Sequence, residues 1–185
     1  GRPGRQRPGD VGPLGRWVGC PVMIVARTRS AAETVELGHA LAQLARPTDL
    51  VLLSGDLGAG KTTFCQGFGR GLGIDEQITS PTFTLVREYT GRLDLYHLDV
   101  YRLEPGEIFD LGLNEVIDDD SVTLIEWGDR VAPLLGNDHL EIRILLGDDD
   151  DERVFRLEPN GRWAVRTRAL RTALATWLDE GSDGC

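Results

Sequence analysis

Apolar residues in this chain form two patterns, short continuous runs and series at helical spacing. The runs Leu50–Leu53 and Val122–Ile125 predict strands that are buried on both faces, as in a parallel sheet, and Met23–Ala26 predicts a short first strand. Ser30 and Glu33 have the spacing of a capping box, and apolar residues follow them at helical intervals. The sequence therefore predicts a helix that begins there and ends before the next proline.

Antiparallel pairs and further helices follow along the chain. Thr84–Tyr89 and Leu93–Leu98 predict a hairpin around a turn that contains glycine. Leu140–Leu146 and Arg153–Leu157 predict a second pair, joined by the acidic run Asp148–Glu152, which we interpret as a solvated loop. More helices are expected at about residues 62–72, 104–114, 129–135 and 163–178. The predicted fold class is α/β, with a mixed, mostly parallel sheet flanked by helices and a ligand at the carboxyl ends of the parallel strands.

The first 22 residues differ in composition from the rest. They are rich in Gly, Pro and Arg, show little periodicity, and lack the apolar stretch of a signal peptide. We expect residues 1–22 to be a disordered or dispensable N-terminal extension, with the natural start at or near Met23, which is the only methionine. Residues 23–185 are expected to form one domain.

The net charge restricts the possible partners. The formal charge is −10, and the first 22 residues contribute four arginines and one aspartate, so the remaining domain is more acidic than the total suggests. Such a domain repels nucleic acid, and we expect no strong direct binding of RNA. No apolar run approaches the roughly 18 residues of a membrane span, and three scattered cysteines favour a reducing, cytoplasmic location.

Twenty side chains are cationic, and all but one of them are arginine. The exception, Lys61, lies in Gly55–Thr62, where the letters GDLGAGKT match the phosphate-loop pattern G-x-x-x-x-G-K-[ST]. A predicted buried strand precedes this loop and a predicted helix follows it. Glycines let backbone N–H groups converge on an anion, and the helix N-terminus adds positive potential. A Gly-rich turn without a ligand is the alternative, which the motif, its context and the single lysine together disfavour.

These features predict a site for a nucleoside triphosphate. Lys61 is expected to contact the β- and γ-phosphates as a compact point charge, and the Thr62 hydroxyl to coordinate Mg²⁺. The residues of this segment that are expected to bind nucleotide are Gly55, Leu57, Gly58, Ala59, Gly60, Lys61, Thr62 and Thr63.

Two acids at strand ends are candidates for the rest of the site. Glu126 directly follows the apolar run Val122–Ile125, and we expect it to face Mg²⁺ directly or through water. Asp99 ends another predicted strand and is a candidate for orienting water or metal. A surface glutamate and a turn-forming aspartate are the respective alternatives.

Several nearby residues allow more than one interpretation. His97 shares a strand face with Asp99, and we expect it to be a hydrogen-bonded structural residue rather than a base. Trp127 fits either core packing or an aromatic lid over the site. Cys65 is expected to be packed in the helix after the loop. The terminal helix is expected to present a solvated basic face, with a docking face as the alternative, formed by Arg162, Arg166 and Arg168.

With these residues in view, the chain resembles the bacterial TsaE family, the ATPase component of tRNA threonylcarbamoyladenosine biosynthesis. The phosphate loop alone is shared by many proteins, but the segments SPTF and HLDVYR together are specific. The order and spacing match over about residues 24–156, and the matching segments are Gly55–Thr63, Ser80–Val86, Tyr96–Leu103 and Ile125–Trp127.

The resemblance implies a cytoplasmic P-loop NTPase-like domain that binds ATP and Mg²⁺, hydrolyses ATP slowly and works with TsaB and TsaD. That pair transfers a threonylcarbamoyl group to the adenosine beside the anticodon, in tRNAs reading codons that begin with adenine. The TsaE protein regulates or resets the complex. The roles implied for single residues are catalysis by Lys61, Asp99 and Glu126, magnesium binding by Thr62 and Glu126, a switch-like position at Thr82, and a nucleotide contact near Ala31.

Two other functions could use the same loop. A small-molecule kinase needs an acceptor pocket and usually an Arg-rich lid, and the arginines between Gly69 and Arg130 are isolated. A nucleotide-gated adaptor would bind ATP without needing to hydrolyse it. A GTPase is excluded, because its N-K-x-D segment needs a second lysine.

Overall fold

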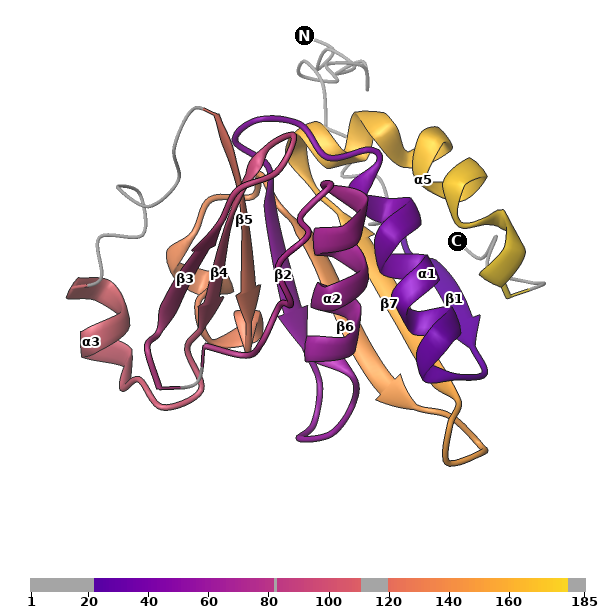
Figure 1. Cartoon of the computed structure of the whole chain (residues 1–185), viewed down its shortest axis with the longest axis horizontal. Coiled ribbons are helices and arrows are strands. Elements are labelled where there is room, and N and C mark those ends of the chain that lie inside the picture. The colour runs from indigo at the N-terminus through magenta and orange to yellow at the C-terminus, as the bar shows by residue number, and fades with distance from the viewer. Residues whose placement is uncertain (1–21, 82, 111–119, 180–185) are drawn as a thin grey trace, which may run out of the picture.

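The computed structural model describes residues 22–81, 83–110 and 120–179. Its centre is a seven-stranded sheet with the strand order β1-β7-β6-β2-β5-β4-β3 (Figure 1). The strands are β1 (Ile24–Thr28), β2 (Leu50–Ser54), β3 (Val86–Tyr89), β4 (Asp94–Asp99), β5 (Ser121–Glu126), β6 (Leu140–Leu146) and β7 (Arg153–Pro159).

Four neighbouring strands in the middle of the sheet, β6, β2, β5 and β4, run parallel. Every residue of β2 and β5 is buried, which explains their continuous apolar runs. The antiparallel pairs lie at the two sides, where β3 pairs with β4 and β7 pairs with both β6 and β1. The predicted α/β class with a mixed sheet is confirmed, and both predicted hairpins form.

Two helices lie side by side across one face of the sheet (Figure 1), and they are α1 (Ala31–Ala42) and α2 (Lys61–Gly71). The first begins as predicted, because the Ser30 side chain accepts a hydrogen bond of 3.1 Å from the Glu33 amide. Glycine allows the helices to approach closely, since a Cβ on Gly67 would lie 2.0 Å from the Val35 carbonyl oxygen. Phe64 and the rest of the larger apolar core fill the space between these helices and the sheet.

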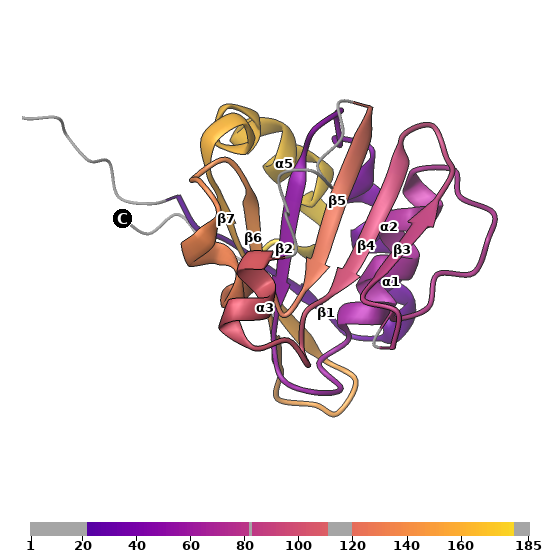
Figure 2. The same cartoon turned by 90° about the vertical axis from the view of Figure 1, so that its left-hand side faces the viewer.

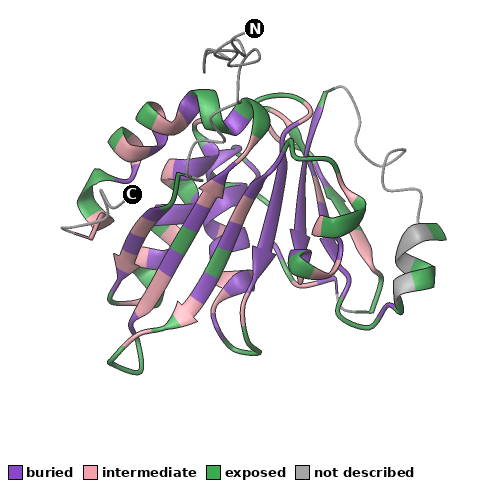
Figure 3. Ribbon diagram, turned by 180° about the vertical axis from the view of Figure 1, so that it is seen from behind, coloured by how far each residue is buried: buried purple, intermediate pink, exposed green. Residues whose placement is uncertain are grey.

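The opposite face of the sheet carries a smaller apolar cluster that includes Leu52, Ile125 and Val131. The 3₁₀ helices Gly128–Arg130 and Ala132–Leu134 cover it in part, and the short helix α3 (Pro105–Asp110) follows β4 in the chain. Figure 2 shows α3 set apart from α1 and α2. Seen from behind, β6 and β7 alternate between buried and exposed residues (Figure 3), so this part of the sheet has one solvated face.

Three predicted helices differ from the structure. Residues 129–135 form two 3₁₀ turns, because Pro133 cannot donate the backbone hydrogen bond of a continuous helix. The predicted helix over residues 104–114 is observed as α3, and its last residues lie outside those described. The terminal segment is divided into the 3₁₀ helix Gly161–Arg166, α5 (Thr167–Ala173) and the 3₁₀ helix Ala175–Trp177.

The prediction of a solvated basic face is wrong for Arg166, which is 6% exposed. Its two terminal nitrogens donate hydrogen bonds of 2.7 and 2.6 Å to the fully buried Asp49 carboxylate. The guanidinium also lies 3.9 Å over the Trp163 ring. The break in the terminal helix occurs at this residue, whose backbone leaves the helical region where its side chain enters the core. Arg162 and Arg168 are exposed as predicted.

The predicted extension over residues 1–22 lies, apart from Val22, outside the described residues. Met23, the predicted start, directly precedes β1. None of the helices in the described part of the chain could span a membrane.

We predict that Asp49→Ala lowers the free energy of unfolding by about 3–5 kcal/mol, because it leaves the Arg166 guanidinium buried without its counter-charge. The double variant Asp49→Leu/Arg166→Met removes both charges and should lose much less. Urea denaturation of the three proteins measures both effects. A loss below about 1 kcal/mol for Asp49→Ala, the size of a surface pair, would contradict this view of the core.

Candidate functional site

Three strand ends meet at one edge of the sheet. The strand register places Leu53 of β2 beside Glu126 of β5, and Glu126 beside Asp99 of β4. Residues 55–60 leave β2 at the same edge and enter α2 at Lys61. The structure therefore brings the predicted phosphate loop and both predicted acids together, as the carboxyl ends of parallel strands require.

The backbone of the loop needs glycine at several points, as Gly55 and Gly60 illustrate. A Cβ on Gly55 would lie 2.4 Å from the Ile144 carbonyl oxygen of β6. Gly60, the N-cap of α2, has φ +104, a conformation that other residues rarely adopt. No side chain caps the first turn of α2, so its N–H groups and its positive dipole end remain available to an anion.

Lys61 is 5% exposed, and its side chain lies against the first residues of the phosphate loop. Its Nζ donates hydrogen bonds to the carbonyl oxygens of Gly55 at 2.8 Å and Asp56 at 2.9 Å. The same atom lies 3.9 Å from the centroid of the Trp127 ring. Burial lowers the pKa of the Lys61 ammonium, and the negative charge of Glu126 opposes that shift.

Glu126 is 3% exposed, and three side chains contact its Oε1 atom. Thr62 Oγ1 donates to it at 3.3 Å, and the Cys65 thiol lies at 3.7 Å. His97 Nε2 lies at 2.9 Å. His97 is therefore hydrogen-bonded, as predicted, and Cys65 is packed, as predicted.

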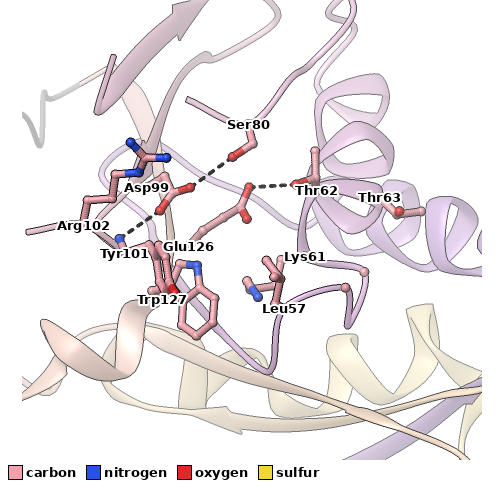
Figure 4. A pocket seen from close by; sticks show the side chains of 12 residues that line it. Leu57, Lys61, Thr62, Thr63, Ser80, Asp99, Tyr101, Arg102, Glu126 and Trp127 are labelled. Carbon is pink, nitrogen blue, oxygen red and sulfur yellow. Dashed lines mark hydrogen bonds between the residues drawn. The ribbon is translucent and has the colours of Figure 1, made fainter. Parts of the chain in front are cut away.

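Asp99 is 4% exposed and lies beside Glu126, at the end of the neighbouring strand β4. Its Oδ1 accepts a hydrogen bond of 2.9 Å from the Tyr101 amide, and its Oδ2 accepts one of 3.1 Å from the Ser80 hydroxyl. Figure 4 shows the Asp99, Glu126 and Thr62 side chains converging near Lys61. Two polar donors therefore hold the carboxylate in place at the cavity that it lines.

A cavity of about 530 Å³ joins these groups (Figure 4). Both acids line it, with Tyr101, Arg102 and Trp127 on the side opposite the loop. The backbone of Trp127 has φ +61. Its half-buried ring lies against Lys61 and also packs against the smaller apolar cluster. The predicted nucleotide-binding residues that line this cavity are Leu57, Gly58, Gly60, Lys61, Thr62 and Thr63.

A second cavity of about 100 Å³ adjoins the first across the loop. Gly58, Gly60 and Thr63 line both cavities, and Ala31 lines the second together with Arg153. The predicted contact near Ala31 is thus placed beside the phosphate loop, at the start of α1. Of the other predicted positions, Gly55 and Ala59 shape the loop without lining either cavity, and Thr82 lies outside the described residues.

The donor atoms at the site fit a magnesium ion. The Thr62 hydroxyl lies 3.3 Å from one oxygen of the Glu126 carboxylate, whose other oxygen makes none of the contacts above, and hard cations prefer hydroxyl and carboxylate oxygens. Cys65, His97 and Glu126 also form a buried cluster whose ligand atoms lie within 4.8 Å of one another. Burial raises the pKa of the Cys65 thiol well above its ordinary value, and the charge of Glu126 adds to the shift, so the protonated thiol is a poor ligand. The oxygens of Thr62 and Glu126 are therefore the better pair.

Sequence reasoning missed two supporting residues. Arg153 of β7 donates a hydrogen bond of 2.9 Å from Nε to the Ala59 carbonyl oxygen, 94 positions away, and so braces the loop. No pattern around Arg153 indicated this contact. Ser80 bonds to Asp99, and its presence in the SPTF segment was the only indication.

A family model described as "Threonylcarbamoyl adenosine biosynthesis protein TsaE" matches residues 28–155 of the chain. Among the relatives, a tRNA threonylcarbamoyladenosine biosynthesis protein TsaE of Bacillus subtilis is 45% identical over 145 residues, covering 78% of this chain and 91% of that protein. The protein of the same name from Streptomyces coelicolor is 48% identical over 140 residues, covering 70% of this chain and 93% of that protein.

A solved structure has the same fold. The crystal structure of YdiB from Bacillus subtilis superposes with a TM-score of 0.71 at 37% sequence identity, covering 81% of this chain and 95% of that one. The phosphate loop and both acids lie within residues 28–155, the segment that the family model covers.

We predict that inorganic triphosphate changes the fluorescence of Trp127, because an anion in the loop attracts the Lys61 ammonium away from the indole ring. Fluorescence titration measures the change, and Trp127→Phe, which retains the other three tryptophans, is the control. The same change in Trp127→Phe would contradict the assignment. So would an unchanged emission when calorimetry shows that triphosphate binds.

Proposed function

Since this chain belongs to the TsaE family of threonylcarbamoyl adenosine biosynthesis proteins, we propose that it is a Mg²⁺-dependent ATPase that serves the synthesis of threonylcarbamoyladenosine in tRNA. One observation carries the proposal. Lys61, Thr62, Asp99 and Glu126 surround a single cavity at the mouth of a phosphate loop. A triphosphate bound there meets an ammonium, a hydroxyl and two carboxylates within one small volume.

The loop binds the phosphates mainly through its backbone. The uncapped N–H groups at the start of α2 point toward the cavity, and the helix dipole favours negative charge there. Lys61 exchanges its two carbonyl acceptors for phosphate oxygens, at no cost in ordering, since its Nζ is already held at the loop. The nucleoside then extends past Thr63 toward the second cavity, where Ala31 lies.

Thr62 and Glu126 would hold the magnesium ion, and the ion would supply positive charge that stabilises the phosphate groups. Asp99 lies across the cavity from Thr62 and accepts hydrogen bonds on both oxygens from fixed donors. That arrangement suits it to orient a water molecule and to accept a proton as the water oxygen bonds to the γ-phosphorus. The bond between the γ-phosphorus and the bridging oxygen breaks, and ADP and phosphate leave. Lys61 stabilises the charge that develops on the transferred group.

The proposed role is that of an accessory to TsaB and TsaD, which carry out the transfer to tRNA. Three exposed apolar side chains lie around the mouth of the cavity. Leu57 is 86% exposed and Tyr101 50% exposed, and both line it. Phe83, 85% exposed, lies beneath the Arg102 guanidinium, which also lines it. A protein partner that covers these residues would sense whether nucleotide is bound, and the acidic surface keeps tRNA contacts with the partner.

We predict that Lys61→Ala reduces ATP hydrolysis by about 100-fold or more, because a single lost donor to the phosphoryl group costs about 3 kcal/mol of transition-state stabilisation. It should also weaken ATP binding. Asp99→Asn should retain nucleotide and lose hydrolysis. Asp94→Asn, at the exposed start of the same strand, is the matched control and should behave as wild type. Phosphate release and calorimetry with ATP measure the two properties separately.

The same variants distinguish the rival functions. If Asp99→Asn abolishes hydrolysis yet sustains repeated rounds of tRNA modification with TsaB and TsaD, the protein is a nucleotide-gated adaptor. If wild type transfers phosphate to a metabolite faster than to water, it is a kinase. If wild type binds no ATP in magnesium buffer, the proposed function fails.

A further inference from the structure

His97 is completely buried between the sheet and α2. It lies two residues before Asp99 on β4, and the parallel register places it beside Leu124, two residues before Glu126 on β5. Its imidazole therefore extends along the sheet toward the carboxylate at the end of the neighbouring strand. The proposed hydrolysis does not use this residue.

The hydrogen bonding of His97 defines its tautomer. Nε2 lies 2.9 Å from Glu126 Oε1, and an ionised carboxylate only accepts hydrogen bonds, so Nε2 carries the proton and donates it. Nδ1 is buried and has no partner among the described residues. A protonated Nδ1 would be a buried donor without an acceptor, and the neutral ring with its proton on Nε2 avoids that cost.

All three contacts to Glu126 fall on one oxygen. His97 makes the shortest, at 2.9 Å, compared with 3.3 Å for Thr62 and 3.7 Å for Cys65. A glutamate carboxylate otherwise rotates broadly about its last torsion. Anchoring Oε1 from inside the core fixes this rotation and leaves Oε2 for a ligand in the cavity that Glu126 lines.

We propose that His97 is a positioning residue that holds the Glu126 carboxylate in the orientation that binds the divalent cation. The inference rests on the proposed function, because it assigns the cation to Glu126. Groups that orient a metal-binding side chain typically contribute 10- to 100-fold in metal affinity. His97 should therefore affect the binding of magnesium, with little effect on nucleotide that binds without metal.

Two amide variants separate this role from simple packing. In His97→Gln the side-chain amide nitrogen reaches the place of Nε2 and can still donate to Glu126. In His97→Asn the nitrogen reaches only the place of Nδ1, so the donor is lost although a polar amide remains. His139, a buried histidine bonded to the Gly136 carbonyl oxygen elsewhere in the fold, provides the control variant His139→Asn.

The experiment measures binding of a non-hydrolysable ATP analogue by calorimetry, in EDTA and across a magnesium series, with thermal unfolding of each protein recorded in parallel. Manganese binding to the analogue-saturated protein, followed by electron paramagnetic resonance, gives metal affinity without turnover. We expect His97→Asn to need 10- to 100-fold more Mg²⁺ or Mn²⁺ for half-saturation, with binding in EDTA unchanged. His97→Gln should lie close to wild type, and His139→Asn should keep the wild-type metal dependence even if it is less stable.

Equal metal dependence in His97→Asn and wild type would overturn the inference, as would equal losses in His97→Asn and His97→Gln. If His97→Asn does not fold, the metal affinity of His97→Gln is the deciding measurement. Wild-type affinity in His97→Gln supports the inference, and an affinity lower by 10-fold or more overturns it. Wild-type protein that shows no magnesium-dependent binding would instead refute the proposed function.

Discussion

Two buried carboxylates and one buried ammonium share a small cavity, and the arrangement of the whole sheet serves to hold them there. Asp99 and Glu126 are almost fully buried, yet Lys61 donates its hydrogen bonds to main-chain carbonyls rather than to either acid. Two carboxylates buried side by side repel each other, so positive charge at the site stabilises them. A divalent cation would compensate the charge of the two carboxylates. A triphosphate would compensate the Lys61 ammonium and the positive end of helix α2. In the proposed function, the site therefore binds a metal–nucleotide complex better than either component alone.

The fold achieves this by bringing distant segments together through the backbone. The parallel strands β2, β5 and β4 end at the same edge and place one acid beside the other. Gly67 allows α2 to lie against α1, which sets Ala31 beside the loop. Arg153 ties the hairpin of β6 and β7 to the loop through the Ala59 carbonyl oxygen. Each contact restrains the loop from a different element, so the geometry of the loop does not depend on its own short sequence alone.

The sequence allowed prediction of those parts of the site that follow from local patterns. The apolar runs Leu50–Leu53 and Val122–Ile125 identified buried parallel strands, and the glycine spacing identified the loop between strand and helix. The contact near Ala31 was implied only by family resemblance. The buried position of Arg166 was not predictable, because its partner Asp49 is 117 residues away and nothing in a helical pattern shows which arginine enters the core. The bond from His97 to Glu126 depends on the strand order, and the bond from Ser80 to Asp99 depends on the path of a loop, and single-residue patterns contain neither.

A crystal structure of the protein with Mg²⁺ and a non-hydrolysable ATP analogue tests the central claim most directly. We expect Lys61 Nζ to have left the carbonyl oxygens of Gly55 and Asp56 for the β- and γ-phosphates, with the metal bound by Thr62 Oγ1 and, directly or through water, by Glu126. Phosphates bound away from residues 55–62, or a Lys61 side chain that keeps its present contacts while the nucleotide lies elsewhere, would contradict the claim.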